Sequence, residues 1–402
     1  MNNSSDITIR LVRQIGDIAA EAWDGCANPA TALPDCDVPT NPFLSYAFLS
    51  ALEDSGSVSA ETGWAPHHLV AEDAAGTLLG AVPLYLKNHS QGEYVFDHSW
   101  AHAFERAGGN YYPKLQASIP FTPATGRRLL VRPGPAAGEV EAGLIGAAAQ
   151  IAENSGVSSV HFTFLTEPEW QRLGRAGYLL RTDQQFHWVN DGYGSFDDFL
   201  QSLASRKRKQ LRRERREAVA AGIDIKIHTG STLTEADWDA FYLFYTDTGM
   251  RKWGRPYLNR EFFSLIGERM ADQIALVLCY RDGRPIAGAL NFIGSDTLFG
   301  RNWGCTEHHP FLHFEACYYQ AIDFAIARGL KRVEAGAQGA HKLARGYLPT
   351  LTYSAHWITD PRFRAAVEDF LEQERRMVEE DKRQLDAHSP FRHTDHDGEP
   401  EK

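Results

Sequence analysis

The feature that most constrains the fold is an internal repeat. An aromatic segment with helical spacing, followed by two apolar stretches around a glycine turn, occurs at 41–86 and again at 239–294. The Gly-Ala pairs at 80–81 and 288–289 take the same place in the two copies, 208 residues apart. A repeat of this length indicates a duplicated domain and not a solenoid. Two unrelated β-hairpins are the alternative, but the helical segment that precedes each one favours duplication.

The length of 402 residues also favours two domains, because single hydrophobic cores stop growing before that size. We predict a first domain over 1–195 and a second over 196–375, divided where a glycine-containing stretch gives way to a charged helix. That basic helix, 205–218, would link the two domains. The stretch 386–402 has few apolar residues and is predicted to be a mobile, disordered tail.

The second domain contains the pattern of a crossover between parallel strands. A strand at 297–305 is followed by a helix that begins near Pro310 and by a short strand at 332–336. This order predicts a partly parallel sheet, so the expected fold class is α/β (α+β). A last amphipathic helix covers 360–385. In the first domain, 96–123 is long and irregular, which is typical of a binding loop or a poorly ordered excursion, and its aromatic residues favour ordered packing.

A basic run stands out against the net charge of −11. Eight of the eleven residues at positions 206–216 are Lys or Arg, and they occupy every face of the predicted helix. The run is either a solvated helix, in which Glu214 and Glu217 are internal partners, or a phosphate-binding patch for tRNA, a nucleotide-linked substrate or coenzyme A. The candidate phosphate-binding residues are Arg206, Lys207, Arg208 and Arg212.

The best candidate for chemistry is the loop EAGAQGAHKLARG, which directly follows the last predicted strand. Polar groups beside glycines at a strand end are typical of sites in open α/β sheets. Glu334 would act as a general base or orient one, and Gln338 would hold a carbonyl, with His341 nearby. Lys342 or Arg345 would bind an anion or stabilise negative charge. An ordinary surface loop is the alternative, but such loops seldom contain so many functional groups.

Weaker candidates for substrate binding lie on either side of this region. Glu315 lies near the start of the predicted helix. The helix dipole would stabilise its negative charge there by about 0.3–1 kcal/mol, so a purely structural role is the alternative. Tyr318 lies on the apolar face of that helix, where a core position is the alternative. Trp253, with Tyr257, would either stack on a planar ligand group or close a turn around Pro256.

Several functional classes lack support. His98/His102 and His309/His313 have i, i+4 spacing, but no acidic residue stands as in H-E-x-x-H, so no metal site is predicted. The sequence has no phosphate-loop, dinucleotide-binding or serine-esterase motif. Its five cysteines lack C-x-x-C spacing, which indicates neither a disulfide framework nor zinc. Without a secretory signal or a long apolar run, the protein is expected in the cytoplasm.

A set of motifs along the chain resembles one bacterial protein family. In order, they are RKRKQLRRERREA, KWGRPYL, RPIAGALNFIG, RNWGC, PFLHFEACYYQAIDFAIARG and EAGAQGAHKLARGYLPTLTYSAHWI. Together they are similar to the predicted N-acyltransferases known as peptidoglycan biosynthesis or recognition proteins, in the FemAB-like branch of the GNAT superfamily. The resemblance covers about 41–370, and the RNWGC string adds Arg301 and Trp303 as substrate-binding candidates.

The resemblance implies two tandem GNAT-like domains, with mixed central sheets flanked by helices, and transfer of an acyl group to an amine. FemAB-like enzymes take the acyl group from aminoacyl-tRNA and lengthen peptidoglycan precursors, so these are the implied co-substrate and acceptor. The loop is also similar to part of the leucyl/phenylalanyl-tRNA–protein transferases, where an acid and a glutamine activate the acceptor amine. On that pattern, Glu334 and Gln338 would be the corresponding pair.

Acyl-CoA is the alternative donor. Acetyl-CoA-dependent GNAT domains carry a Q/R-x-x-G-x-G/A turn whose N–H groups bind the pyrophosphate. The corresponding link here, 305–313, has no glycine, Pro310 lacks an N–H, and Glu307 would repel a phosphate. This disfavours conventional coenzyme A binding. An acyl-CoA-dependent N-acetyltransferase and a non-catalytic module that binds cell-wall fragments are the alternative functions.

Overall fold

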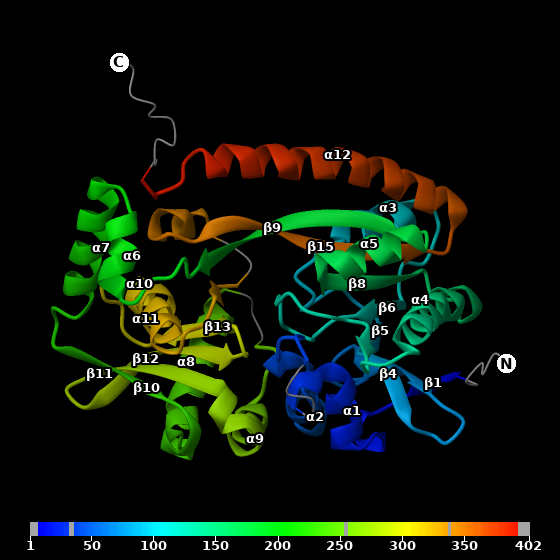
Figure 1. The fold of residues 1–402 in the computed structure, drawn as a ribbon, viewed down its shortest axis with the longest axis horizontal. Helices are drawn as coiled ribbons and strands as arrows, with labels where there is room; N and C mark the ends of the chain where they lie inside the picture. Colours follow the sequence, from blue (N-terminus) through cyan, green and yellow to red (C-terminus); the bar gives the residue numbers. More distant parts are fainter. Residues whose placement is uncertain (1–6, 32–35, 253–255, 337–338, 393–402) are drawn as a thin grey trace.

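In the computed structural model, which describes residues 7–31, 36–252, 256–336 and 339–392, two lobes share one long sheet (Figure 1). The sheet has eleven strands, in this order: β10 (Ile223–His228), β11 (Ile274–Arg281), β12 (Arg284–Ile293), β13 (Thr297–Cys305), β14 (Arg332–Glu334), β9 (Leu179–Val189), β15 (Leu348–Ile358), β8 (Ser159–Leu165), β6 (Lys114–Ala117), β5 (Leu84–Lys87) and β2 (Trp64–Pro66). A four-stranded sheet in the first lobe contains β1 (Thr8–Val12), β3 (His68–Glu72), β4 (Leu78–Val82) and β7 (Leu130–Val131).

Helices flank these sheets, so the predicted class of mixed α/β sheets in two lobes is confirmed. The first lobe contains α1 (Ala20–Ala27), α2 (Tyr46–Asp54), α3 (His98–Arg106), α4 (Ala137–Asn154) and α5 (Glu167–Arg175). The rest of the chain contains α6 (Phe196–Ser202), α7 (Ser205–Ala218), α8 (Glu235–Lys252), α9 (Arg260–Met270), α10 (Leu312–Phe314), a π-helical turn (Glu315–Tyr319), α11 (Gln320–Ala327) and α12 (Pro361–Asp386). Across the described ranges, no helix combines the length and apolar content needed to span a bilayer.

The internal repeat corresponds to two antiparallel hairpins. β3 and β4 place Gly80 opposite Ala71, and β11 and β12 place Gly288 opposite Leu278. The helix α2 precedes the first hairpin and α8 precedes the second. In the second lobe, the chain runs from β13 through α11 to β14, and the two strands pair in parallel. This confirms the predicted crossover. The structure therefore supports the duplication inferred from the sequence.

The two lobes exchange their last strands. β9 ends the first lobe but lies between β14 and β15, and β15 in turn lies between β9 and β8. β9 and β15 pair antiparallel over nine residue pairs, with Leu348 opposite His187 at one end and His356 opposite Leu179 at the other. The predicted boundary near residue 195 follows the end of β9, but β15 and α12 return to the first lobe (Figure 1). The second lobe is therefore not the continuous segment predicted.

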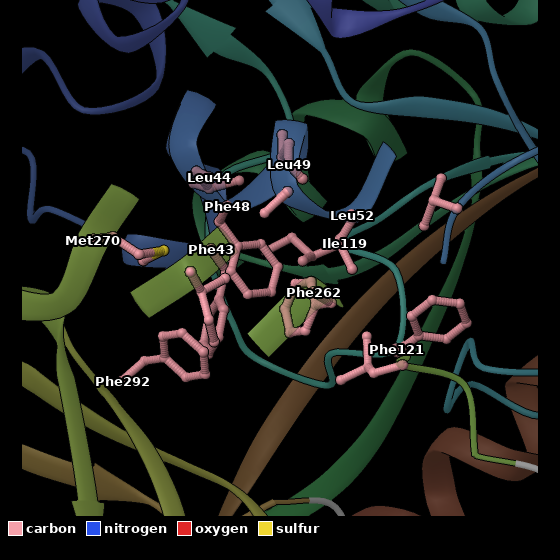
Figure 2. Close-up of a cluster of buried hydrophobic side chains, with 14 of the residues drawn as sticks. Phe43, Leu44, Phe48, Leu49, Leu52, Ile119, Phe121, Phe262, Met270 and Phe292 are labelled. Carbon is pink, nitrogen blue, oxygen red and sulfur yellow. The ribbon is translucent and has the colours of Figure 1, made fainter. Parts of the chain in front are cut away.

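An apolar cluster also joins the lobes. Figure 2 shows Phe43 and Phe48 of the first lobe beside Phe262 of α9 and Phe292 of β12. The ring centroids of Phe43 and Phe292 are 4.9 Å apart, and those of Phe48 and Phe262 are 5.7 Å apart. All four rings are buried. Because burying one such side chain contributes about 1.5–3 kcal/mol, this cluster reinforces the exchanged strands.

Two segments whose order was in question from the sequence are ordered where the structure describes them. The 96–123 stretch contains α3 and β6, and β6 lies inside the large sheet, so the ordered packing expected from its aromatic residues is confirmed. At the other end, Phe391 forms a β-bridge with Leu203 and packs into the core of the second lobe. The predicted mobile tail is therefore wrong for 386–392, and the remainder of it lies outside the described residues.

The exchanged strands lead to a prediction about stability. Trp188 on β9 lies opposite Val333 and is fully buried, whereas Trp357 on β15 lies opposite Val160 and is partly exposed. We expect Trp188→Ala to lower the free energy of unfolding by about 3–5 kcal/mol, and Trp357→Ala to lower it by less. Urea unfolding followed by far-UV circular dichroism should show one transition for both lobes. Two separate transitions, or a larger effect of Trp357→Ala, would contradict this view of the exchange.

Candidate active site

The sheet of the second lobe opens where β13 and β14 diverge. Their parallel ladder ends with Phe299 opposite Glu334. Beyond this pair, β13 continues to Cys305, whereas β14 stops. In open α/β sheets, ligands bind beyond the carboxyl ends of strands that separate in this way. The residues that follow Phe299 and Glu334 therefore line the candidate active site.

Glu334 lies at this divergence and is almost fully buried, with 5% of its surface exposed. The backbone N–H of Thr125, from the first lobe, donates to its Oε2 at 3.4 Å. Burial raises the pKa of the Glu334 carboxyl to about 7, although the charge of Arg332 opposes the shift. A carboxyl that titrates near neutral pH is suited to take a proton from a substrate amine. The geometry therefore supports Glu334 as the candidate general base.

His341 and Tyr318 meet beside the loop that follows β14. The Tyr318 hydroxyl and His341 Nε2 are 2.9 Å apart. The row of rings continues toward β13, because the His313 ring lies 5.5 Å from that of Tyr318 and 5.2 Å from that of Trp303. Burial and neighbouring positive charges lower the pKa of His341, so its imidazole is mainly neutral at pH 7. The structure thus brings together three residues that the sequence singled out: His341, Tyr318 and Trp303.

Lys342 fixes the start of the same loop. Its Nζ donates to the backbone carbonyls of Ala335 at 2.6 Å and Gly336 at 2.9 Å, and its side chain is buried. Burial lowers the pKa of the Lys342 ammonium to about 8. An ammonium has three N–H donors, so these two carbonyls leave one for a substrate oxygen. The position is compatible with the predicted stabilisation of negative charge.

Arg345 and Glu315 are held in ion pairs within the protein. Arg345 Nη2 donates to both carboxylate oxygens of Glu214, at 2.9 and 3.0 Å, and its guanidinium carbon lies 3.4 Å from the centre of the Phe314 ring. Glu315 accepts from Arg215 at 2.8 and 3.1 Å. Both residues are almost fully buried. These contacts tie α7 to the loop, so the geometry favours a positioning role over substrate binding for Arg345 and Glu315.

α7 also presents a basic outer face. Arg206, Lys209 and Arg213 line a shallow hollow of about 400 Å³, and all three are exposed. Their spacing of three and four residues puts them on one face of the helix. Arg206 is one of the predicted phosphate-binding residues, whereas Lys209 and Arg213 were not singled out from the sequence. A helical wheel of the run would have identified both, because they lie on the same face as Arg206 and away from the buried residues Leu211, Glu214 and Ala218.

The other predicted phosphate-binding residues lie differently. Lys207 and Arg208 are half-buried, and Arg208 donates to the side chain of Gln201. Arg212 pairs with Asp197 at 3.1 Å in an exposed contact. Exposed ion pairs of this kind contribute little stability, so a phosphate can displace Asp197 at small cost.

A cavity of about 220 Å³ lies at the end of β13. Its lining combines an indole, a thiol, imidazoles and a carboxylate, contributed by Thr248, Trp303, Cys305, Glu307, His308, His309, Leu312 and His313. The link 305–313 therefore forms a cavity wall, although it lacks the glycines of a pyrophosphate-binding turn. The cavity adjoins the row of rings described above, and Thr248 is a lining residue that sequence reasoning missed.

Three predicted site residues remain: Arg301, Gln338 and Trp253. Arg301 lies on β13, two residues beyond Phe299, and donates to the backbone carbonyl of Phe121 in the first lobe. Gln338 and Trp253 lie outside the described residues. Through Phe121, the first lobe thus reaches the candidate site.

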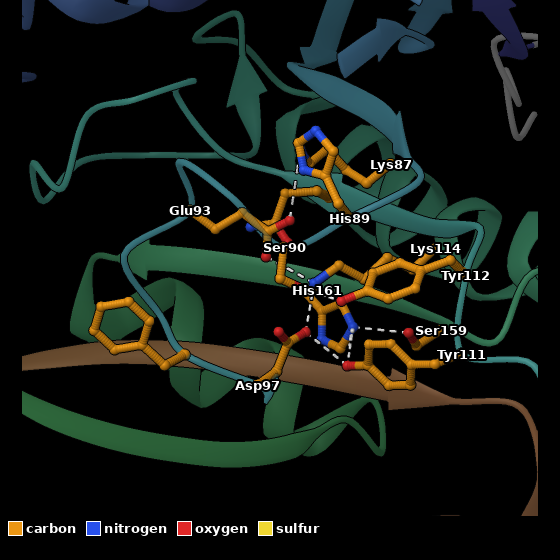
Figure 3. Close-up of polar contacts among 12 residues, drawn as sticks. Lys87, His89, Ser90, Glu93, Asp97, Tyr111, Tyr112, Lys114, Ser159 and His161 are labelled. Carbon is orange, nitrogen blue, oxygen red and sulfur yellow. Dashed lines mark hydrogen bonds and ion pairs between the residues drawn. The ribbon is translucent and has the colours of Figure 1, made fainter. Parts of the chain in front are cut away.

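A second buried polar cluster lies in the first lobe and was also missed (Figure 3). Lys114 Nζ is 2.7 Å from Glu93 Oε2 and also contacts Asp97. Beside them, His161 Nδ1 is 2.6 Å from Nδ1 of His356, on the exchanged strand β15. Lys87 Nζ of β5 lies 3.8 Å from Glu93 Oε1, so two lysines compensate the two carboxylates Glu93 and Asp97, which burial requires. We interpret the cluster as the anchor that holds the strands β5 and β6 against β8.

Comparison with known proteins places these features in context. A family model described as FemAB-like, peptidoglycan biosynthesis/recognition, matches residues 14–393. The crystal structure of FemX is similar, with a TM-score of 0.54 at 12% identity, over 87% of this chain and 98% of FemX. The C-terminal domain (DUF2156) of a putative lysylphosphatidylglycerol synthetase from Agrobacterium fabrum has a TM-score of 0.52 at 10% identity, over 87% of this chain and 96% of that one. No curated protein is significantly similar in sequence. The family match confirms the resemblance seen in the motifs, and the two structures share the fold.

The raised pKa of Glu334 predicts how stability changes with pH. In the folded state the pKa is about 7, against 4.5 for an ordinary glutamate, so the contribution of Glu334 to stability is fully present below pH 4.5 and is lost as the pH rises through 7. Glu334→Gln removes this loss and should raise the free energy of unfolding by roughly 3 kcal/mol at pH 8, with little change at pH 4.5. Urea unfolding at the two pH values measures the difference.

The matched control is Glu72→Gln. Its hydrogen bond with Arg10 lowers the pKa of Glu72, so this variant should show no gain in stability at pH 8. An equal effect of Glu334→Gln at both pH values would show that the Glu334 carboxyl does not titrate near neutral pH.

Proposed function

The chain belongs to the FemAB-like family, and from this premise we propose that it is an N-acyltransferase, which moves an acyl or aminoacyl group from an activated ester or thioester to an amine. The observation that carries the proposal is the Glu334 carboxyl. It is buried, its pKa is about 7, and it stands where β13 and β14 diverge. That combination suits the removal of a proton from an ammonium group at neutral pH.

In the proposed reaction, Glu334 takes one proton from the acceptor ammonium, and the amine lone pair forms the bond to the donor carbonyl carbon. Lys342 stabilises the oxyanion of the tetrahedral intermediate. When the intermediate collapses, the bond to the donor oxygen or sulfur breaks, and Tyr318 gives that atom a proton. A second proton from the amine nitrogen restores Tyr318 through His341. The products are an amide, the free alcohol or thiol of the donor, and the proton that Glu334 releases to solvent.

We propose aminoacyl-tRNA as the donor. The basic outer face of α7 leads to the cavity at the end of β13, because the Arg213 guanidinium carbon lies 5.9 Å from the ring centre of Phe311, and the next residue, Leu312, lines the cavity. Phosphates on α7 would thus place an attached ester near Trp303. The family description supports an amine of a peptidoglycan precursor as the acceptor. The reaction would take place in the cytoplasm, where aminoacyl-tRNA is made.

Acyl-CoA is the second candidate donor, and the cavity of about 220 Å³ beside Trp303 favours it, since a thioester arm would fit such a space. The two donors differ in the contact they need with α7. A tRNA would place several phosphates along the helix, whereas coenzyme A carries few. Binding measured over a range of salt concentrations separates them, because only the tRNA complex should weaken steeply.

Glu334→Gln should lower kcat by roughly 10²–10⁴-fold, because an amide cannot take up the amine proton. The assay is mass spectrometry of amide formation from aminoacyl-tRNA on a peptidoglycan-precursor amine, repeated with acyl-CoA. The wild-type rate should rise with pH through about 7, since Glu334 must be ionised. Glu72→Gln serves as the control and should keep both the rate and the pH profile. If Glu334→Gln folds and keeps full activity, the assignment of the base is wrong.

Reversing the charge of Arg206, Lys209 and Arg213 to Glu should weaken binding of aminoacyl-tRNA at low salt. Each lost phosphate contact should also reduce the slope of log K against log salt by roughly 0.9 or less, so the triple variant should lose up to about 3. Filter binding at several salt concentrations measures this. The same charge change on α12, at Arg376, Lys382 and Arg383, is the control and should leave the slope unchanged. An unchanged slope for the α7 variant would exclude this face as the tRNA contact.

A further inference from the structure

Arg301 carries a positive charge for which the described residues provide no carboxylate ion pair. It lies on β13, two residues beyond the last pair with β14, and is partly buried. Its Nη2 donates to the backbone carbonyl of Phe121, and the side chains of Tyr94 and Tyr245 are its neighbours. A guanidinium has five N–H donors, so these contacts leave donors for a further acceptor.

The groups around Arg301 are fixed in place. The Phe121 ring stacks on that of Tyr257, with centroids 4.9 Å apart and planes 9° apart. The Tyr245 hydroxyl accepts from the backbone N–H of Tyr257 at 3.2 Å. The Phe121 ring also packs closely against the backbone of Gly92, where a Cβ would lie 2.6 Å from the ring. Arg301 therefore stands in a preorganised frame built from both lobes.

The same segment of the first lobe reaches both Arg301 and Glu334. Phe121 accepts from Arg301 through its carbonyl, and Thr125, four residues later, donates to Glu334 through its N–H. Arg301 lies two residues beyond Phe299, the residue of β13 that pairs with Glu334. The charge of Glu334 also acts on Arg301. A ligand held between the lobes would therefore meet a fixed cation and the proposed base.

Removing a guanidinium from water without a directly paired carboxylate is costly. Glu334 acts on Arg301 without forming an ion pair with it, and a half-buried arginine in this situation is typical of a binding site for an anion. The planar fork of arginine matches a carboxylate with two parallel hydrogen bonds. Building on the proposed function, we propose that Arg301 binds a free carboxylate of the acceptor, and that the acceptor class is an amine that carries a carboxylate, as in an amino acid or a peptide.

The test compares glycylglycine with glycylglycinamide, which differ in the charge at one end. Calorimetric titration of the full-length protein should show that the acid binds roughly 10- to 100-fold more tightly than the amide. Arg301→Met should abolish this preference by weakening the acid alone, and Arg301→Lys should retain only part of it, since it keeps the charge but loses the fork. Arg10→Met, which removes a surface arginine already paired with Glu72, is the control and should keep the full preference.

In turnover, the preference should appear in KM and not in kcat, because Arg301 positions the acceptor and transfers no proton. Equal binding of acid and amide by the wild-type protein, including no binding of either, overturns the proposal. So does an equal loss of both ligands in the Arg301 variants. If the variants do not fold, the comparison of acid with amide on the wild-type protein still decides. Transfer activity that needs Glu334 but shows no preference for the acid would refute this inference alone and leave the acyltransferase proposal standing.

Discussion

The antiparallel pairing of β9 with β15 is the interaction on which the rest of the structure depends. Nine consecutive residue pairs make each lobe's sheet continuous only through a strand of the other lobe. The exchange is symmetric in sequence, because a His-Trp pair takes equivalent positions at 187–188 of β9 and 356–357 of β15. One histidine lies opposite Glu334 and the other opposite His161. Each is buried and contacts a polar side chain two positions earlier at 3.2 Å. Duplication followed by exchange thus places a buried imidazole from one lobe beside the critical strand of the other.

The two lobes use this common plan differently. In the second lobe, β13 and β14 separate and leave Glu334 at the point of divergence. In the first lobe, β6 pairs in parallel with β8, and β5 extends the sheet beyond it. The position that corresponds to Glu334 is then His161, which bonds with Ser159 and belongs to the cluster around Lys114 (Figure 3). Because the cluster's charges are matched within the protein, the first lobe has a buried ionic core where the second has the proposed base. The proposed chemistry accordingly belongs to the second lobe.

Local patterns in the sequence predicted the local structure well. The hairpins, the crossover and the last helix depend on residues close together in the chain, where periodicity and glycine turns are informative. The exchanged strands could not be predicted in the same way, because pairing between β9 and β15 joins residues more than 150 positions apart. The same limit applies to the loop after Glu334: its residue types were visible, but the partner of Arg345 is Glu214, 131 residues away. A signal for the exchange did exist, since FHWV at 186–189 resembles AHWI at 355–358.

The basic helix α7 shows why charge counted along a sequence does not define a surface. One part of its charge faces inward, where Arg215 pairs with Glu315 and Asp323 and fixes the helix to the second lobe. On the outer part, only Arg213 of the three hollow residues has an ion pair among the described residues, an exposed one with Glu217 at 3.4 Å. Crowded like charges oppose folding, so function is the better explanation for keeping them. Arg345 connects the two regions: its Nη2 holds Glu214 of α7, while its Nη1 donates to the backbone carbonyl of His341 at 2.7 Å. Arg345 thus connects the helix proposed to hold donor phosphates with the histidine proposed to relay a proton.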